Sequence, residues 1–190
     1  MRKVKKFKLT SEFIVDISGV KLFRIKALIE FGNVKAGDLG GYIEKEENLS
    51  HMGNAWVSGN AQVSGDARVF GDARVFGNAQ VSGDAQVFGD ARVFGNAWVS
   101  GNAQVSGDAQ VFGDARVSGD KDYAYAHGFG SCNRTTTFFR LKDGDVGVRC
   151  GCFYGTLAQF RDNVCATHGE TKKAQEYLML ADLMEIRFKN

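Results

Sequence analysis

Hydrophobic and polar positions repeat every six residues through the middle of the chain. Valine recurs at every sixth position from Val57 to Val117, and alanine stands two residues before each valine, from Ala55 to Ala115. In an Ala-x-Val segment the first and third side chains point to one face of a strand and the middle one to the other. Glycine beside Asn or Asp allows a tight corner between segments. Each hexapeptide is therefore predicted to be a short strand followed by a turn.

The residue after each valine follows a longer period of eighteen residues. Sorted by that period, phenylalanine occupies two of three columns and never the third. The columns read Ser58, Phe76, Phe94, Phe112; then Ser64, Ser82, Ser100, Ser118; then Phe70, Phe88, Ser106. Three hexapeptides per coil explain this pattern, so residues 53–124 are predicted to form a three-sided parallel β-helix with valine and alanine inside. Four coils at ~4.8 Å each make a stack about 19 Å tall.

The segment before the repeat is predicted to be an N-terminal β cap over residues 1–52. A cap is needed because the terminal coil of a β-helix exposes an unpaired backbone edge. Strand-like runs at residues 5–10 and 21–31 supply its strands. His51 stands in the register of a repeat valine, so we expect coil-like winding to begin before Gly53.

Residues 125–190 are predicted to form a small α/β appendage that opens with a β-hairpin. Strands at residues 135–142 and 145–153 meet through Asp143-Gly144, which is a strong hairpin signal. This appendage would close the other end of the β-helix.

Two helices are predicted after the hairpin. Thr156 and Gln159 have the spacing of a capping box at the start of the first helix, and Gly169 is a suitable stop for it. The second helix, at residues 172–188, is apolar around most of its circumference. That distribution predicts burial on both sides, and a partner subunit is one candidate for the second contact.

Composition and charge limit the classes of function. The chain has 190 residues, no proline, four cysteines and a formal net charge of +2. This charge favours no nucleic-acid partner and excludes none, and a long basic stripe is absent. No apolar run is long enough to span a membrane, and no apolar segment follows the basic N-terminus. We therefore expect no membrane association, reduced cysteines and a cytoplasmic location.

Three cysteines and a histidine have spacings that a metal site can use. Cys150 and Cys152 would share one face of a strand, and Cys165 and His168 one face of a helix, so four ligands could converge. However, Cys150 and Cys152 also continue the predicted inward face of their strand, and free cysteine is a common small core residue. We predict packing rather than metal binding, and no cofactor.

The repeat lacks the residues of an acyltransferase site. Enzymes built on hexapeptide repeats typically place a histidine and an inserted loop beside the coils. Residues 53–120 contain no His, Cys or Lys and no inserted loop, and only His51 and His127 lie near the two ends. A general base is missing where that chemistry needs one, so such an enzyme is an alternative and not the favoured interpretation.

One outer face of the predicted β-helix has the composition of an interface. It carries Trp56, Arg74, Arg92, Phe76, Phe94 and Phe112. Aromatic residues and arginine are enriched at interface centres. The alternative is that each phenylalanine packs only on its neighbour one coil away. We favour an interface, and a homo-oligomer is the preferred occupant.

A second candidate surface is the loop at Ser131, Asn133 and Arg134. It follows Gly128-x-Gly130 and offers amide, hydroxyl and guanidinium groups that could hold an anion such as a nucleotide. No complete phosphate-binding motif is present, and a solvated linker is the alternative interpretation.

Several segments resemble the hexapeptide-repeat proteins of bacteriophages and prophages. They are DLGGYIEKEENLS at residues 38–50, the uninterrupted hexapeptides, TTTFFR, and GCFYGTL followed by THGE. The resemblance covers nearly the whole chain and implies a left-handed parallel β-helix in a phage accessory protein of the host bacterial cytoplasm. It carries over no catalytic residue. We therefore expect a non-enzymatic phage-encoded protein that binds a host protein or complex, for example as an inhibitor of an antiviral defence such as CRISPR interference or nucleotide signalling. The alternatives are an acyltransferase-like enzyme and a structural, self-assembling scaffold.

Overall fold

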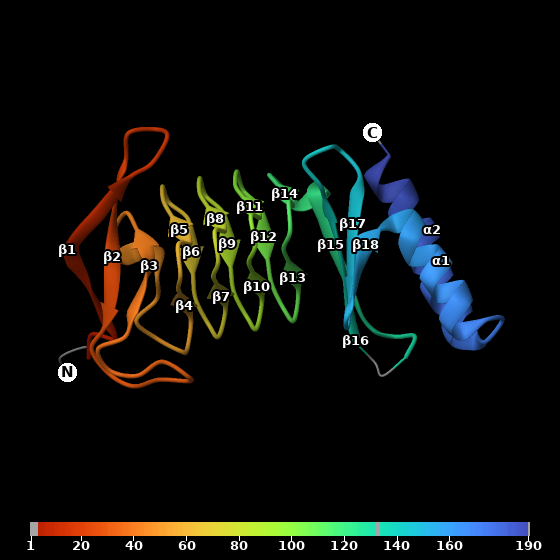
Figure 1. The fold of residues 1–190 in the computed structure, drawn as a ribbon, viewed down its shortest axis with the longest axis horizontal. Helices are drawn as coiled ribbons and strands as arrows, with labels where there is room; N and C mark the ends of the chain where they lie inside the picture. The colour runs from red at the N-terminus through yellow and green to blue at the C-terminus, as the bar shows by residue number, and fades with distance from the viewer. Residues whose placement is uncertain (1–3, 132–133, 190) are drawn as a thin grey trace.

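The computed structural model describes residues 4–131 and 134–189, arranged as three parts along one long axis (Figure 1). A β cap comes first, the solenoid second, and a sheet covered by two helices last. The predicted three-sided β-helix with an N-terminal β cap and a C-terminal α/β appendage is confirmed.

The solenoid consists of two-residue strands, one for each hexapeptide. They are β4 (Trp56–Val57), β5 (Gln62–Val63), β6 (Arg68–Val69), β7 (Arg74–Val75), β8 (Gln80–Val81), β9 (Gln86–Val87), β10 (Arg92–Val93), β11 (Trp98–Val99), β12 (Gln104–Val105), β13 (Gln110–Val111) and β14 (Arg116–Val117). The strands pair in parallel every eighteen residues and form three sheets, with β4-β7-β10-β13 and β6-β9-β12 on two sides and β5-β8-β11-β14 on the third.

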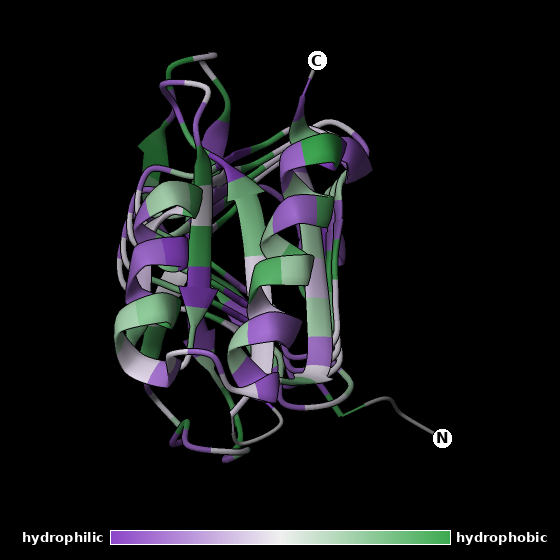
Figure 2. Ribbon diagram, turned by 90° about the vertical axis from the view of Figure 1, so that its right-hand side faces the viewer, coloured by the Kyte–Doolittle hydropathy of each residue, from purple (hydrophilic) through white to green (hydrophobic). Residues whose placement is uncertain are grey.

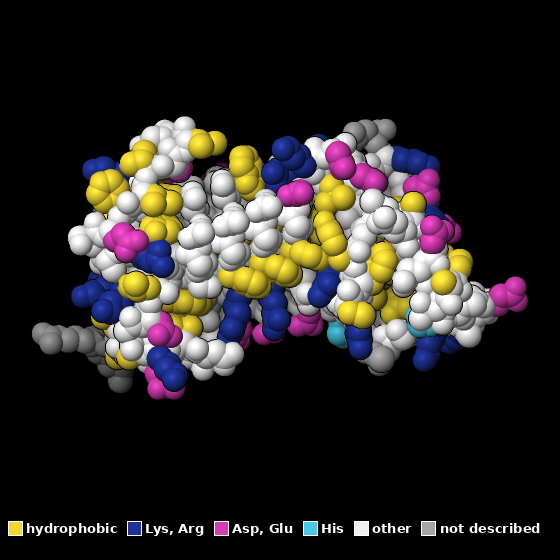
Figure 3. Space-filling model, viewed as in Figure 1, with side chains coloured by type: hydrophobic (Ala, Val, Ile, Leu, Met, Phe, Trp, Pro, Cys, Tyr) yellow, Lys and Arg dark blue, Asp and Glu magenta, His cyan; other side chains and the backbone are white. Residues whose placement is uncertain are grey.

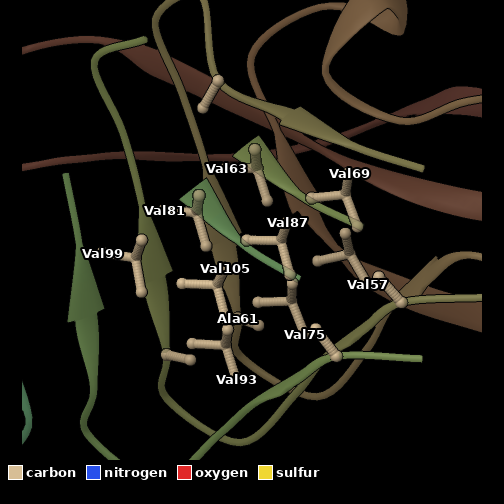
Figure 4. Packing of buried hydrophobic residues seen from close by; sticks show 14 of the residues in the cluster. Val57, Ala61, Val63, Val69, Val75, Val81, Val87, Val93, Val99 and Val105 are labelled. Carbon is tan, nitrogen blue, oxygen red and sulfur yellow. The ribbon is translucent and has the colours of Figure 1, made fainter. Parts of the chain in front are cut away.

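The core of the solenoid is a set of stacked valine columns (Figure 4). Val57, Val75, Val93 and Val111 pair in one register and are completely buried, as the eighteen-residue period predicts.

Glycine is required at the corners for two reasons. Gly83 has a φ of +66°, and a Cβ there would lie 3.0 Å from the backbone of Gly101 in the next coil.

The N-terminal cap is continuous with the solenoid. It comprises β1 (Phe7–Val15), β2 (Lys21–Ala27) and β3 (Leu39–Ile43), and β3 pairs in parallel with β5. Winding does begin before Gly53, but the register predicted from His51 is wrong. Leu49 takes the valine position and bridges Val69, twenty residues later, because a short 3-10 turn at Glu46–Asn48 changes the spacing. The His51 ring instead stacks on Phe7, with 4.3 Å between ring centroids.

The C-terminal part is a four-stranded antiparallel sheet with two helices packed on it. Its elements are β15 (Tyr123–Phe129), β16 (Arg134–Arg140), β17 (Val146–Cys150), β18 (Phe153–Thr156), α1 (Leu157–His168) and α2 (Lys172–Phe188). The predicted strand 145–153 is two strands, because the chain reverses at Gly151, where φ is +58°. The capping box is confirmed: the Gln159 N–H donates to the Thr156 hydroxyl, and the Thr156 N–H donates to the Gln159 side chain.

Strand β16 joins the two hydrophobic cores. Adjacent residues of a strand point to opposite faces. Phe139 completes the solenoid core, and Phe138 belongs to the core beneath the helices, with both side chains completely buried. A bridge between Ala115 and Leu141 fixes the sheet on the last coil.

Candidate functional site

Stacked aromatic rings run from the solenoid onto the C-terminal sheet. Phe76, Phe94 and Phe112 are nearly parallel, with 4.7 Å between successive centroids, and the Tyr154 ring lies 4.2 Å from Phe112. We call these four residues the aromatic strip. On the face of the molecule in Figure 3, hydrophobic side chains likewise form a band along the solenoid, with Lys and Arg side chains beside it. The predicted stacking between coils is thus present; the three phenylalanine rings remain half-buried at the surface, and Tyr154 is exposed.

Arginine side chains border the aromatic strip. Arg92 is exposed, Arg74 is half-buried, and the guanidinium of Arg149 lies over the Phe112 ring at 5.1 Å. Among the described residues, no carboxylate lies within 4.0 Å of Arg74 or Arg92. These guanidinium groups are therefore available to an external acid.

Trp56 does not belong to the exposed surface, contrary to the sequence prediction. Only 7% of its surface is exposed, and its ring packs edge-to-face against Phe31 at 5.3 Å. The connection between β2 and β3 covers the first coil here. The sequence of the repeat does not indicate which coils a cap will cover, so the burial of Trp56 could not be predicted from it.

One residue of the aromatic strip, Tyr154, and one residue beside it, Arg149, had no signal in the repeat. Arg149 and Tyr154 reach it because the C-terminal sheet docks on the last coil, where the Gln110 N–H donates to the Thr137 hydroxyl at 3.1 Å. Tyr154 points back to the solenoid because β18 reverses after Gly151. Only the tertiary contact brings these side chains to Phe112.

The second candidate surface uses its amide groups within the chain. The Gly130 N–H donates to a Glu176 carboxylate oxygen at 2.7 Å, and the Ser131 N–H donates to the Tyr177 hydroxyl at 2.9 Å. The loop therefore holds an anionic group of its own chain. Arg134 is exposed, and Asn133 lies outside the described residues.

The proposed metal ligands have different environments. Cys150 is half-buried and accepts a hydrogen bond from Thr136, whereas Cys152 and Cys165 are exposed. The prediction that Cys152 continues the inward face is wrong, because the chain turns at Gly151. In the described part of the chain, no three His, Cys, Asp or Glu side chains are grouped to hold a metal ion. His168 packs beside the Tyr177 ring, 5.8 Å away.

Neither ring nitrogen of His51 is both accessible and unpaired. Nδ1 accepts the Lys6 backbone N–H at 3.2 Å, and Nε2 is buried 3.6 Å from a Glu46 carboxylate oxygen. His127 is different because its ring is exposed, with Nδ1 2.9 Å from the Thr135 hydroxyl and 3.9 Å from Asp108. His127 alone of these two has the accessibility that a general base needs.

Three surface hollows lie away from the aromatic strip. The first, about 960 Å³, is lined by His51, Met52 and Arg68 at the N-terminal end. Another, about 540 Å³, lies between α2 and β15, and the third, about 310 Å³, lies beneath the β1–β2 hairpin beside Trp98. His127 lines none of them. None of the four residues of the aromatic strip lines one of these three hollows, and a row of surface rings suits a macromolecule better than an enclosed small ligand.

Comparison with known proteins gives one family match, within the repeat. Residues 61–75, 67–83 and 85–101 match the YdcK Beta solenoid repeat family. No curated protein is significantly similar to the chain. The match lies within the solenoid and supports the repeat architecture. No helix in residues 4–131 or 134–189 has the length and apolar character to cross a membrane.

Proposed function

We propose that this protein is a non-enzymatic binding protein that holds an acidic surface of a host protein or complex on its aromatic strip. The observation that carries the proposal is the continuous row of rings from Phe76 to Tyr154, bordered by the unpaired guanidinium of Arg92. The row crosses from the solenoid to the C-terminal sheet, so both parts of the chain contribute to one surface.

The chemistry of the aromatic strip suits a protein partner with carboxylate or phosphate groups. Aromatic rings supply contact area at low cost in side-chain entropy, and arginine pairs with planar acids through two parallel hydrogen bonds. Coils repeat at ~4.8 Å, so Arg74 and Arg92 present two cations on adjacent rungs.

The test compares charge reversal on two faces of the solenoid. The variant Arg92→Glu with Arg149→Glu changes the aromatic strip, and Arg68→Glu changes an exposed arginine at the equivalent strand position of another face. We expect wild type and Arg68→Glu to retain the same bacterial protein in affinity capture, and the double variant to lose at least nine-tenths of it. Equal retention by all three folded proteins would contradict the proposal.

The more specific role is that of a phage or prophage protein that inhibits an antiviral defence of the host bacterium. The segments that resemble phage hexapeptide-repeat proteins support it. Expression in cells with active CRISPR interference should raise the plating efficiency of a targeted phage, and the double variant should abolish the rise. If the double variant raised the plating efficiency as much as wild type, the anti-defence role would not depend on the aromatic strip.

The enzyme alternative depends on His127. Its exposed ring, with Nδ1 held near Thr135 and Asp108, is the one observation that favours it. Replacing His127 with Gln should leave partner binding within a few-fold of wild type. Loss of the cellular effect in a folded His127→Gln protein that still binds would favour the enzyme.

A further inference from the structure

Helix α2 carries a row of exposed apolar side chains on its outer side. The exposed fractions are 71% for Met179, 54% for Leu183 and 71% for Ile186. Their spacing of i, i+4 and i+7 places them on one side of the helix. The opposite side is buried in the C-terminal core through Tyr177, Ala181 and other residues. The predicted burial on both sides of α2 is therefore found on one side only within the chain.

The charges of α2 differ between its two halves. Lys172 and Lys173 occupy the first turn, where positive charge opposes the helix dipole, and neither has an ion-pair partner among the described residues. Asp182 and Glu185 lie in the second half. Both contact Arg161, and Glu185 also pairs with Lys189 at 3.0 Å, yet the side chains of Asp182 and Glu185 remain 65% and 48% exposed. An antiparallel copy of α2 would bring the unpaired Lys172 and Lys173 beside these partly exposed carboxylates.

We propose that a second copy of this chain covers the outer side of α2, with the two α2 helices antiparallel about a two-fold axis at Met179. In this register Met179 meets Met179 of the second copy, and Lys173 lies opposite Glu185. A two-fold contact requires such self-complementarity. Methionine at the axis suits it because its flexible side chain adapts to its own copy.

The dimensions predict a weak dimer that leaves the aromatic strips free. Helix α2 has 17 residues and is about 25 Å long, and α1 lies beside it on the same layer (Figure 2). Two adjacent helices offer roughly 500 Å² per subunit, less than the ~800 Å² of a standard interface. We therefore expect dissociation at micromolar concentration. The two solenoids would point in opposite directions from the helix layer.

Light scattering across a dilution series tests the contact. Wild type should change from dimer to monomer between about 100 and 1 μM, and Met179→Glu with Ile186→Glu should be monomeric throughout. The matched control is Ile17→Glu, because Ile17 is 92% exposed on the β1–β2 hairpin. It should dimerise as wild type does. A monomeric wild type at every concentration, or a dimer that survives the α2 changes, would overturn the proposal.

Disulfide cross-linking tests the register. In a chain with Cys132→Ser, Cys152→Ser and Cys165→Ser, Met179→Cys should form a covalent dimer under mild oxidation, since the two positions meet at the axis. Gln175→Cys is the control: four residues from the axis, its two copies are displaced by about 12 Å, beyond disulfide reach. Cross-linking at position 175 and not at 179 would overturn the antiparallel register, even if light scattering showed a dimer.

Discussion

At the N-terminal edge of the solenoid the backbone presents mainly carbonyl oxygens, and at the C-terminal edge it presents mainly N–H groups. This difference follows from the parallel coils, in which amides of one coil donate to carbonyls of the next, as in the bond from Trp56 to Ala73. The first coil is left mainly with carbonyls and the last mainly with N–H groups, although the Ser106 and Asp114 carbonyls also accept bonds from Tyr123 and Lys142 of the C-terminal part. The two caps must therefore supply opposite chemistry.

The N-terminal cap supplies donors at each corner of the first coil. The Lys6 ammonium donates to the carbonyls of Ala55 and Gly53 at 2.8 and 3.3 Å. The Asn48 amide donates to Ala67 and Gly65 at 2.9 and 3.0 Å. The third corner is closed by β3, whose backbone N–H groups donate to Ala61 and Val63.

The C-terminal cap supplies acceptors. Asp120 accepts the Gln104 N–H, Thr137 accepts the Gln110 N–H, and Asp122 accepts the Ser118 N–H, all at 3.1 Å. A buried lysine thus lies at one end and carboxylates at the other. Because both caps bond to the edges, further coils cannot be added without displacing a cap, which argues against the self-assembling scaffold.

The largest effect is expected for Asn48→Asp. The isosteric carboxylate would face two carbonyl oxygens at a position with no exposed surface. Burying an uncompensated charge costs about 3–5 kcal/mol, so the free energy of unfolding in urea should fall by that amount. A loss under about 1 kcal/mol would mean that the N-terminal edge does not require a donor.

The next effect concerns Lys6 and pH. Burial lowers the pKa of Lys6 to about 8, whereas the unfolded chain keeps 10.5. Between these values the unfolded state binds more protons, so the free energy of unfolding should rise by about 1–3 kcal/mol from pH 8 to 10. Above pH 10 the gain should reverse, because burial raises the pKa of Tyr123 and its unfolded form ionises first. Lys6→Met should remove the rise below pH 10 and leave the later fall.

A smaller effect is expected for Asp122→Asn at the opposite edge. Asp122 accepts bonds from the Ser118 N–H and hydroxyl, and an asparagine oxygen can still accept there. The loss of charge assistance should cost about 1 kcal/mol in urea unfolding. If this exchange proved as costly as Asn48→Asp, the contrast between donor and acceptor edges would be incorrect.

The smallest effect is expected for Asn78→Asp between the two edges. Asn78 is exposed in a ladder of side-chain amides that already ends in Asp114. Its coil is paired on both sides, so the change should alter the free energy of unfolding by less than about 0.5 kcal/mol. Urea unfolding of Asn78→Asp and Asn48→Asp, measured side by side, compares the same exchange in the middle of the solenoid and at its edge.

The solenoid could be predicted from the sequence because its contacts repeat. The eighteen-residue period fixes which valines and phenylalanines stack, and the structure has those columns. The capping residues could not be predicted, since Lys6 and Asn48 act on carbonyls 47 to 49 and 17 to 19 residues away. A lysine on a strand and an asparagine in a turn are usually exposed. Lys6 and Asn48 are buried because they donate to the free carbonyls at the N-terminal edge of the solenoid.

The candidate site was only partly predictable for the same reason. Phe76, Phe94 and Phe112 follow from the period, and their stacking is confirmed. The burial of Trp56 and the arrival of Tyr154 depend on how each cap docks. Local patterns thus define the faces of the solenoid, and tertiary contacts decide which parts remain exposed.

Amide hydrogen exchange at the C-terminal edge tests most directly the claim that cap side chains pair the free backbone. The Gln110 amide should be protected in wild type to a degree near that of Arg92, whose N–H donates within the solenoid. Thr137→Val removes the acceptor and keeps the shape, so exchange at Gln110 should accelerate at least tenfold while exchange at Gln104, bound by Asp120, stays unchanged. Fast exchange at Gln110 in wild type, or an unchanged rate in Thr137→Val, would contradict the account.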